Sequence, residues 1–186
     1  MEFHVKNMVC DRCIMVVRED FESVGFTVSD IDLGTIVTKE ESFSVDQKIA
    51  LKSKLEGHGF QFLKSEDEIV SDKIKTALLH YINKELLSEK LSDYLKTKLH
   101  KDYGVLSKQF SKHNHVTIEK YFIKLKIEKA KQYIREDVYN FSEIAGVLGY
   151  NSLSYLSTQF KKETGVSLSE FKSNPELQRN TLDKIL

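Results

Sequence analysis

The stretch Asn151–Phe171, NSLSYLSTQFKKETGVSLSEF, decides the fold, because the chain carries an earlier version of it. Leu106–Phe122, LSKQFSKHNHVTIEKYF, aligns without gaps on Leu156–Lys172, LSTQFKKETGVSLSEFK, and six of the 17 positions are identical. The same offset of 50 residues aligns LSD at 91–93 with FSE at 141–143. An internal repeat of this kind marks a structural unit that occurs more than once. The sequence therefore predicts two copies of one helical unit in the C-terminal half.

The second copy has the pattern of two short helices joined by a tight turn. Ser142 is expected to start the first helix, and Gly149 to form the turn, since glycine takes a positive φ without steric cost. Asn151 is expected to cap the second helix and Gly165 to end it. Two such helices form a helix-turn-helix, whose second helix fits the major groove of DNA. The spacing places one set partly inward (Leu153, Leu156, Phe160) and another outward (Ser154, Tyr155, Ser157, Thr158, Lys161).

The first copy follows the same plan less cleanly. Ser92 with Asp93 is expected to start its first helix, His100 stands where a turn glycine is expected, and Asp102 can cap its second helix. On that second helix the predicted inner residues are Val105, Leu106 and Phe110, and the outer ones are Gly104, Ser107, Lys108 and Ser111. One long amphipathic helix over 118–134 is predicted between the copies, with Lys120, Lys124 and Lys131 on a solvated face.

The first 65 residues have a different pattern, in which strands alternate with helices. Alternating apolar residues predict strands near 2–8, 26–33, 36–37 and 60–63, and apolar residues at helical spacing predict helices over 14–24 and 46–57. The second helix is marked by Ile49, Leu51 and Leu55. The order βαββαβ predicts a ferredoxin-like sandwich with split βαβ units.

Charge is unevenly distributed, although the chain is neutral overall. Residues 1–66 have a net charge of −4 and residues 89–186 one of +5, so the repeated half has the sign that a polyanionic partner requires. No apolar run approaches the roughly 20 residues of a membrane span, and no secretory leader is evident, which predicts a cytoplasmic protein. Apart from two cysteines, no catalytic grouping has a readable spacing, so we expect no enzyme.

Both cysteines lie in one motif, Met8-Val9-Cys10-Asp11-Arg12-Cys13, between the first strand and the first helix. A single C-x-x-C indicates metal or redox chemistry. In motif and topology, residues 1–65 resemble the heavy-metal-associated domain of copper chaperones and metal-transporting ATPases. The resemblance implies that Cys10 and Cys13 bind a soft cation, typically Cu(I), and that Met8 is a buried anchor. Two soft sulfurs suit Cu(I), and a helix N-terminus favours thiolate.

Three other interpretations of the cysteine pair stay open. The domain can have this fold without binding metal in the cell, the pair can be a redox switch, or the cysteines can be inert packing. The redox alternative lacks the Trp and Pro neighbours of a thioredoxin motif. His58 could be a third ligand, but an exposed histidine at a helix end is the simpler interpretation. His115 occupies the position of Gly165 in the repeat, which favours a helix-end role over a metal site with His113.

The C-terminal half resembles a known family. The segment 141–172, FSEIAGVLGYNSLSYLSTQFKKETGVSLSEFK, is similar to the signature of AraC/XylS transcription regulators, and LKIEKAKQYI is similar to their linker helix. The resemblance implies that two recognition helices enter successive segments of the major groove on one face of the duplex. Thr158 stands where the family often has arginine, so readout of bases is expected to be limited. The base-facing positions carried over are Gly104, Ser107 and Lys108 in the first helix and Ser154, Tyr155, Ser157 and Thr158 in the second. Contacts to phosphates are expected from Lys101, Lys112, Lys161 and Lys162. Asn151, at the start of the second recognition helix, is also expected at the DNA-binding surface.

Together these observations predict an α+β plus all-α protein. Residues 1–65 form the ferredoxin-like domain, 66–88 a helical connector, 89–174 a DNA-binding domain with helix-turn-helix units at about 91–117 and 141–172, and 175–186 a tail. We expect a regulator that binds double-stranded DNA, responds through Cys10 and Cys13 to a soft metal ion, and contacts RNA polymerase if it activates. The alternative is a metal-binding or redox-responsive protein whose helical half docks another protein. The sequence does not define the oligomeric state.

Overall fold

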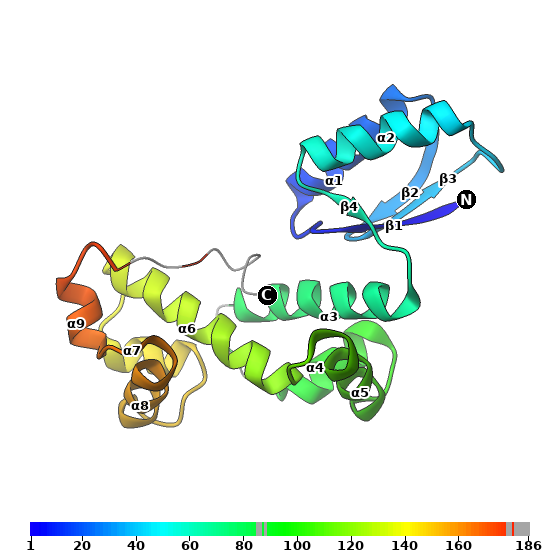
Figure 1. Ribbon diagram of the computed structural model, residues 1–186. Coiled ribbons are helices and arrows are strands. Elements are labelled where there is room, and N and C mark those ends of the chain that lie inside the picture. The colour runs from blue at the N-terminus through cyan, green and yellow to red at the C-terminus, as the bar shows by residue number, and fades with distance from the viewer. Residues whose placement is uncertain (85–86, 88, 178–179, 181–186) are drawn as a thin grey trace. The chain divides into compact units, whose positions relative to one another are not determined.

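The computed structural model describes residues 1–84, 87, 89–177 and 180 of the 186-residue chain (Figure 1). The chain forms two compact units, Met1–Thr76 and Ala77–Leu186. The division falls inside one helix, α3 (Glu66–Ile82), which lies within the segment predicted as a connector. Among the described helices, none is both long and apolar enough to span a bilayer.

The first unit has the predicted βαββαβ order. Its elements are β1 (Glu2–Lys6), α1 (Asp11–Ser23), β2 (Val28–Asp32), β3 (Thr35–Thr38), α2 (Val45–Gly57) and β4 (Gln61–Phe62). The sheet order is β2-β3-β1-β4, and β1 pairs antiparallel with both neighbours. Each helix therefore connects two parallel strands with another strand between them, the split βαβ arrangement. Both helices cover the same face of the sheet (Figure 1).

Aromatic side chains fill the space between this sheet and its helices. The ring of Phe3 lies 5.2 Å from that of Phe21 and 5.6 Å from that of Phe26, both in edge-to-face geometry. Met8 is fully buried in the same core, as predicted, and is therefore a packing residue. Ile49, one of the residues from which α2 was predicted, is 62% exposed. The inner face of α2 is formed instead by Leu51 and Leu55, which stand four residues apart.

Residues 66–82 of the segment predicted as a helical connector form α3, and residues 85, 86 and 88 of that segment lie outside the described residues. The start of α3 is fixed by Glu68, whose carboxylate accepts hydrogen bonds from the backbone N–H groups of Lys64 and Ser65, while the Ser65 hydroxyl accepts from Glu68 N–H. In the first unit Asp72 of this helix is buried close to the β2–β3 turn at Gly34. Burial raises the pKa of the Asp72 carboxyl to about 6.

The second unit is entirely helical over its described residues and contains the predicted repeat. Its further elements are α4 (Leu91–Leu99), α5 (Tyr103–Asn114), α6 (Ile118–Glu136), α7 (Phe141–Val147), α8 (Leu153–Thr164) and α9 (Leu168–Ser173). Buried residues recur at an offset of 50, in the pairs Leu106/Leu156, Phe110/Phe160, Ile118/Leu168 and Tyr121/Phe171. The two residues of each pair occupy equivalent positions in the repeat, so equivalent faces of the helices are buried in both copies.

Several helix starts differ from the prediction. The N-cap of α7 is Asn140, whose side chain accepts from Ser142 N–H and Glu143 N–H, so Ser142 lies inside the helix. The N-cap of α8 is Ser152, which accepts from Tyr155 N–H, and Asn151 precedes it. The copies also differ here, because α4 begins after Lys90 without a side-chain cap. At Asn140 the deciding feature is a capping box with Glu143, which requires a spacing of three residues.

Candidate nucleic-acid interface

The two candidate recognition helices, α5 and α8, have the same length and nearly the same burial pattern. Each has 12 residues and is anchored by a leucine and a phenylalanine four residues apart, which lie on one face. In α8 the relative exposure of Leu156 and Phe160 is 0%, and in α5 that of Leu106 is 1% and that of Phe110 is 0%. Fixing one face in this way leaves the opposite face of each helix available to a partner.

The outer face of α8 is rich in hydroxyl groups. Ser154, Tyr155 and Thr158 are exposed and Ser157 is half-buried, so the predicted residues share one side of the helix. Tyr155 is 60% exposed, and its ring lies 5.9 Å from that of Tyr150. The hydroxyl of Thr158 donates to the carbonyl oxygen of Ser154 at 2.9 Å. Its hydrogen is therefore already used inside the helix.

Basic groups follow at the C-terminal ends of both helices. Lys161 and Lys162 are exposed in the last turn of α8, and Lys112 is exposed in the last turn of α5. The predicted cap residue Asn151 is exposed just before α8. Leu153, which was expected to face partly inward, is 37% exposed at the surface.

The outer face of α5 carries fewer side-chain groups. Gly104 and Lys108 are exposed and Ser107 is half-buried. The expectation that Val105 faces inward is wrong, since this side chain is 51% exposed in the first turn, before the buried stripe begins at Leu106. A partner of this face would therefore meet the Lys108 ammonium group, the Ser107 hydroxyl group and the backbone at Gly104, which has no side chain.

A tyrosine that the sequence analysis did not single out fixes the start of α5. The hydroxyl of Tyr103 donates a short hydrogen bond to the carboxylate of Glu119 in the first turn of α6. Burial and this carboxylate raise the pKa of the Tyr103 phenol well above its usual range. The bond ties the recognition helix of the first copy to the long helix that both copies share.

The ends of α5 and α8 have matching geometry despite different residues. His115 and Gly165 both adopt a left-handed conformation, with φ of 56° and 82°, and their N–H groups bond to the carbonyls of Ser111 and Lys161. This confirms that His115 has a helix-end role. His100 also has a positive φ, of 52°, and replaces the turn glycine between α4 and α5.

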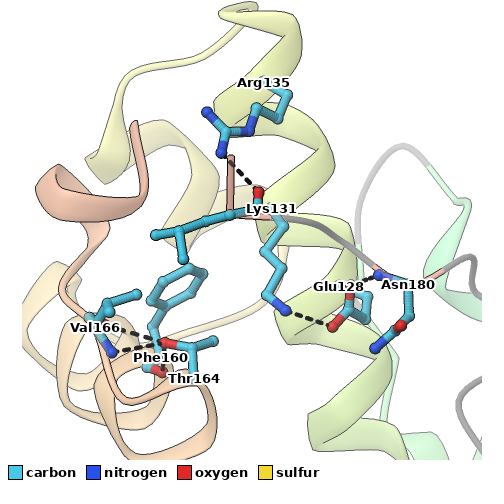
Figure 2. Close-up of polar contacts among 8 residues, drawn as sticks. Glu128, Lys131, Arg135, Phe160, Thr164, Val166 and Asn180 are labelled. Carbon is cyan, nitrogen blue, oxygen red and sulfur yellow. Dashed lines mark hydrogen bonds and ion pairs between the residues drawn. The ribbon is translucent and has the colours of Figure 1, made fainter. Parts of the chain in front are cut away.

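Polar contacts close the turn after α8 and join the segment after α9 to α6 (Figure 2). The hydroxyl of Thr164 donates to the carbonyl oxygen of Phe160 at 2.7 Å and accepts from Val166 N–H at 3.3 Å, closing the turn after α8. Arg135 donates to the carbonyl oxygens of Asn174 and Leu177 at 2.6 and 2.8 Å. These bonds restrain α8 and the segment after α9.

The lysines of α6 do not form one solvated stripe. The side chain of Lys131 is only 12% exposed and pairs with Glu128 at 2.7 Å, so its predicted solvation is wrong (Figure 2). The second carboxylate oxygen of Glu128 accepts from Asn180 N–H. Lys120 and Lys124 are exposed, as predicted.

The cysteine pair lies at the start of α1. The sulfur atoms of Cys10 and Cys13 are 3.4 Å apart, and Cys10 is the exposed N-cap residue of the helix. Hydrogen bonds from Cys13 lower the pKa of Cys10, while burial raises that of Cys13. Of the two cysteines, Cys10 is therefore the one that loses its proton more readily.

Two sulfurs are the whole candidate ligand set within the described residues, where no group of three or more His, Cys, Asp or Glu side chains could hold a metal. A ligand role for His58 is not supported, because its Nδ1 atom lies 2.9 Å from the buried carboxylate of Asp20. Asp20 was not identified from the sequence. It lies between Val17 and Phe21 on the buried face of α1, and an acidic residue at such a position indicates a polar partner. The pair itself fits a soft cation, since two metal–sulfur bonds of about 2.3 Å can span sulfurs up to about 4.6 Å apart.

Comparison with known proteins classifies the C-terminal half. Residues 95–174 match the family model described as a helix-turn-helix domain. The C-terminal half therefore contains a helix-turn-helix domain. Helix-turn-helix domains of this kind bind DNA and have no enzymatic activity, in agreement with the prediction of a non-enzyme. The match leaves residues 1–94 uncovered, so the resemblance of the first unit to heavy-metal-associated domains stays a prediction.

Two solved structures are similar to the chain. The C-terminal domain of AraT, a response regulator from Geobacillus stearothermophilus, is 20% identical, with 63% of this chain and 94% of that one covered at a TM-score of 0.52. This likeness shows the fold. A DNA-binding transcriptional dual regulator from Escherichia coli K-12 is 19% identical, with 54% of this chain and 90% of that one covered at a TM-score of 0.48. No curated protein matches the sequence.

Proposed function

We propose that this protein is a transcription regulator that binds double-stranded DNA through α5 and α8 of its AraC-type domain. The observation that carries the proposal is the repeat, in which two helices of 12 residues bury the same leucine and phenylalanine positions and expose the same opposite face. Because the proposed partner is chromosomal DNA, we expect the protein to act in the cytoplasm. An activating role would add RNA polymerase as a second partner.

The exposed side chains suggest how bases are read. In α8 we assign base contacts to Ser154, Tyr155, Ser157 and Thr158, and in α5 to Gly104, Ser107 and Lys108. Because the Thr158 hydroxyl bonds to the helix backbone, its methyl group is the part free to meet a base. A threonine methyl packs well against the methyl group of thymine in the major groove. Lys108 is the one residue of this set with a charged donor, the kind of group that most often contacts guanine.

Phosphate contacts supply much of the affinity in this proposal. Lys112 and Lys161 lie in the last turns of the two recognition helices, Lys101 precedes α5, and Asn151 precedes α8. Contacts of this kind position a protein on the duplex and weaken as counterions are added, but carry little sequence information. The predicted affinity is therefore strongly dependent on salt, with modest sequence discrimination.

The cysteine pair is proposed as a sensor site. Cys10 and Cys13 would hold a soft cation such as Cu(I), which supplies a positive charge that stabilises both thiolates. Without the cation, Cys10 loses its proton more readily than Cys13, and Cys13 must lose its proton when the cation binds. A redox response is the competing proposal, supported by the sulfur separation of 3.4 Å and the exposure of Cys10.

Selection of bound duplexes from random DNA tests the main proposal. We expect enrichment of a motif rich in A·T pairs at the positions read by α8, with affinity that falls steeply as salt rises. Equal recovery of all sequences would reject a site-selective regulator. The sensor claim is tested separately by measuring DNA affinity with and without Cu(I), for the wild type and for a Cys10→Ser/Cys13→Ser variant. Four identical curves would remove the sensor and leave the DNA proposal intact.

A further inference from the structure

The second unit contains a pocket of ≈ 230 Å³ between α6 and the turn that leads into α8. Three of its ten lining residues are aromatic: Phe122 from α6, Tyr150 from the turn and Tyr155 from α8. The volume is that of about eight liquid water molecules, below the range of roughly 300–1,000 Å³ typical of drug-sized ligands. The pocket therefore suits a fragment-sized ligand with a flat apolar body.

A single half-buried cation, Lys126, lies in this pocket. Its ammonium nitrogen is 5.2 Å from the ring centroid of Phe122 and 4.7 Å from that of Tyr150. Burial alone lowers the pKa of Lys126 to about 8, and no carboxylate in the described part of the chain offsets that burial. Ring faces stabilise an ammonium only partly compared with an anion. Among the described residues, Lys126 is therefore a desolvated charge without a carboxylate partner.

The acidic residue in the pocket sets the orientation of any anion. Glu119 also lines the pocket, and its carboxylate accepts the hydrogen bond from Tyr103. Glu119 and Lys126 are seven residues apart on α6, which places them about 10 Å apart along the same face of the helix. An anionic group is thus attracted to the Lys126 end and repelled from the Glu119 end, so a bound molecule would lie along the aromatic wall.

We propose that this pocket binds a small organic monoanion, of the aromatic carboxylate class, whose charged group pairs with Lys126 and whose ring packs against Phe122 and Tyr150. Asn151 and Tyr155 also line the pocket and belong to the proposed DNA-binding surface. Occupation of the pocket consequently changes the affinity of α8 for DNA. This second consequence rests on the proposed function, whereas binding of the anion does not.

The test uses benzoate as the probe, with acetate and benzyl alcohol as matched controls that lack its ring and its charge. The full chain, labelled with ¹⁵N, is titrated without DNA. We expect benzoate to shift the amide signals of Ile123, Gly149 and Tyr155, and each control to bind at least about tenfold more weakly. Equal shifts with acetate would mean only a general attraction of anions, and absence of shifts with benzoate at about 10 mM would overturn the proposal.

Substitutions separate the role of Lys126 from general charge. Lys126→Met is expected to weaken benzoate binding about tenfold or more, and Lys126→Arg to retain most of it. Lys124→Met removes an exposed lysine of the same helix and is expected to bind as the wild type does. If Lys126→Met does not fold, the proposal is still tested by comparing benzoate, acetate and benzyl alcohol on the wild type and on Lys126→Arg.

The DNA consequence has its own readout. Fluorescence anisotropy of the selected duplex, with and without benzoate, is expected to show a change in affinity that Lys126→Arg retains. If benzoate binds but DNA affinity is unchanged, the pocket stands and its link to α8 fails. If benzoate does not bind and Lys126→Met weakens DNA binding with a smaller salt dependence, Lys126 is a phosphate contact and the small-anion proposal is wrong.

Discussion

The hydroxyl of Thr158 donates to the carbonyl oxygen of Ser154, 2.9 Å away on the preceding turn of α8. In the proposed DNA complex, the position at which AraC/XylS regulators often have arginine would therefore present a methyl group to the bases. Thr158→Val keeps the shape of the side chain and removes only this internal bond, so we expect DNA affinity to change less than about twofold. Titration of the selected duplex checks this, and a loss of tenfold would show that the hydroxyl contacts DNA.

Thr158→Arg adds a cation on the same face. We expect tighter DNA binding and a salt dependence steeper by about one phosphate contact. Where a guanine lies opposite, we expect about 1–3 kcal/mol of new discrimination. Binding curves at several salt concentrations measure both effects, and an unchanged slope would place Thr158 away from the duplex.

Substitutions at the start of α7 can test whether Asn140, the N-cap in the structure, or Ser142, the residue expected from the sequence, stabilises this helix end. Asn140→Ala removes the side chain that accepts from Ser142 N–H and Glu143 N–H, and we expect a loss of about 0.5–2 kcal/mol in the free energy of unfolding. Ser142→Ala is the matched control and should change it by less than about 0.5 kcal/mol. Denaturant titration compares the two variants. A larger effect at Ser142 would restore the expected cap.

The matched helix ends at His115 and Gly165 predict opposite effects of adding and removing a side chain. Gly165→Ala places a Cβ atom at a φ of 82° and should cost about 1–2 kcal/mol, although no atom lies within 4 Å of that Cβ. His115→Gly relieves the same kind of strain and should gain stability or leave it unchanged. Thermal unfolding of both variants measures the changes, and equal losses would mean that backbone conformation does not control these positions.

Asp72 predicts a pH dependence of stability in the first unit. Burial raises the pKa of this carboxyl from 3.8 to about 6, so the folded state holds the proton more tightly than the unfolded chain. The free energy of unfolding therefore falls as the pH rises from about 4 to about 6 and stays lower above that range.

Asp72→Asn keeps an oxygen acceptor and removes the charge. We expect this variant to lose that part of the pH dependence and to be more stable at pH 7 by about 2–3 kcal/mol, the order of magnitude of a shift of about two pKa units. Urea unfolding at several pH values, followed by the amide signals of β1, gives the comparison. Parallel pH profiles for the two proteins would contradict it.

The elements that follow from apolar spacing were predictable from sequence. Leu156 and Phe160, like Leu106 and Phe110, stand four residues apart and are buried. The sheet order of the first unit follows from its βαββαβ pattern in the same way. The outer faces of α5 and α8 were also predicted, since a helix that buries one stripe must expose the other.

Residues that depend on tertiary contacts were not predictable. The Tyr103–Glu119 bond joins two helices, and the His58–Asp20 pair joins residues 38 positions apart. Lys131 looks solvated by periodicity and is instead paired with Glu128. The pocket around Lys126 similarly depends on the packing of the turn before α8 on α6, which periodicity does not encode.

Hydroxyl-radical footprinting of the wild-type protein on its selected duplex tests the central claim most directly. Two recognition helices acting together predict two protected segments on one face of the DNA, separated by about one helical turn of 10–10.5 base pairs. The counterpart control is a Lys108→Ala/Ser107→Ala variant, which should lose protection in one segment and retain it in the other. A single protected segment in the wild type, or uniform protection along the duplex, would contradict the account.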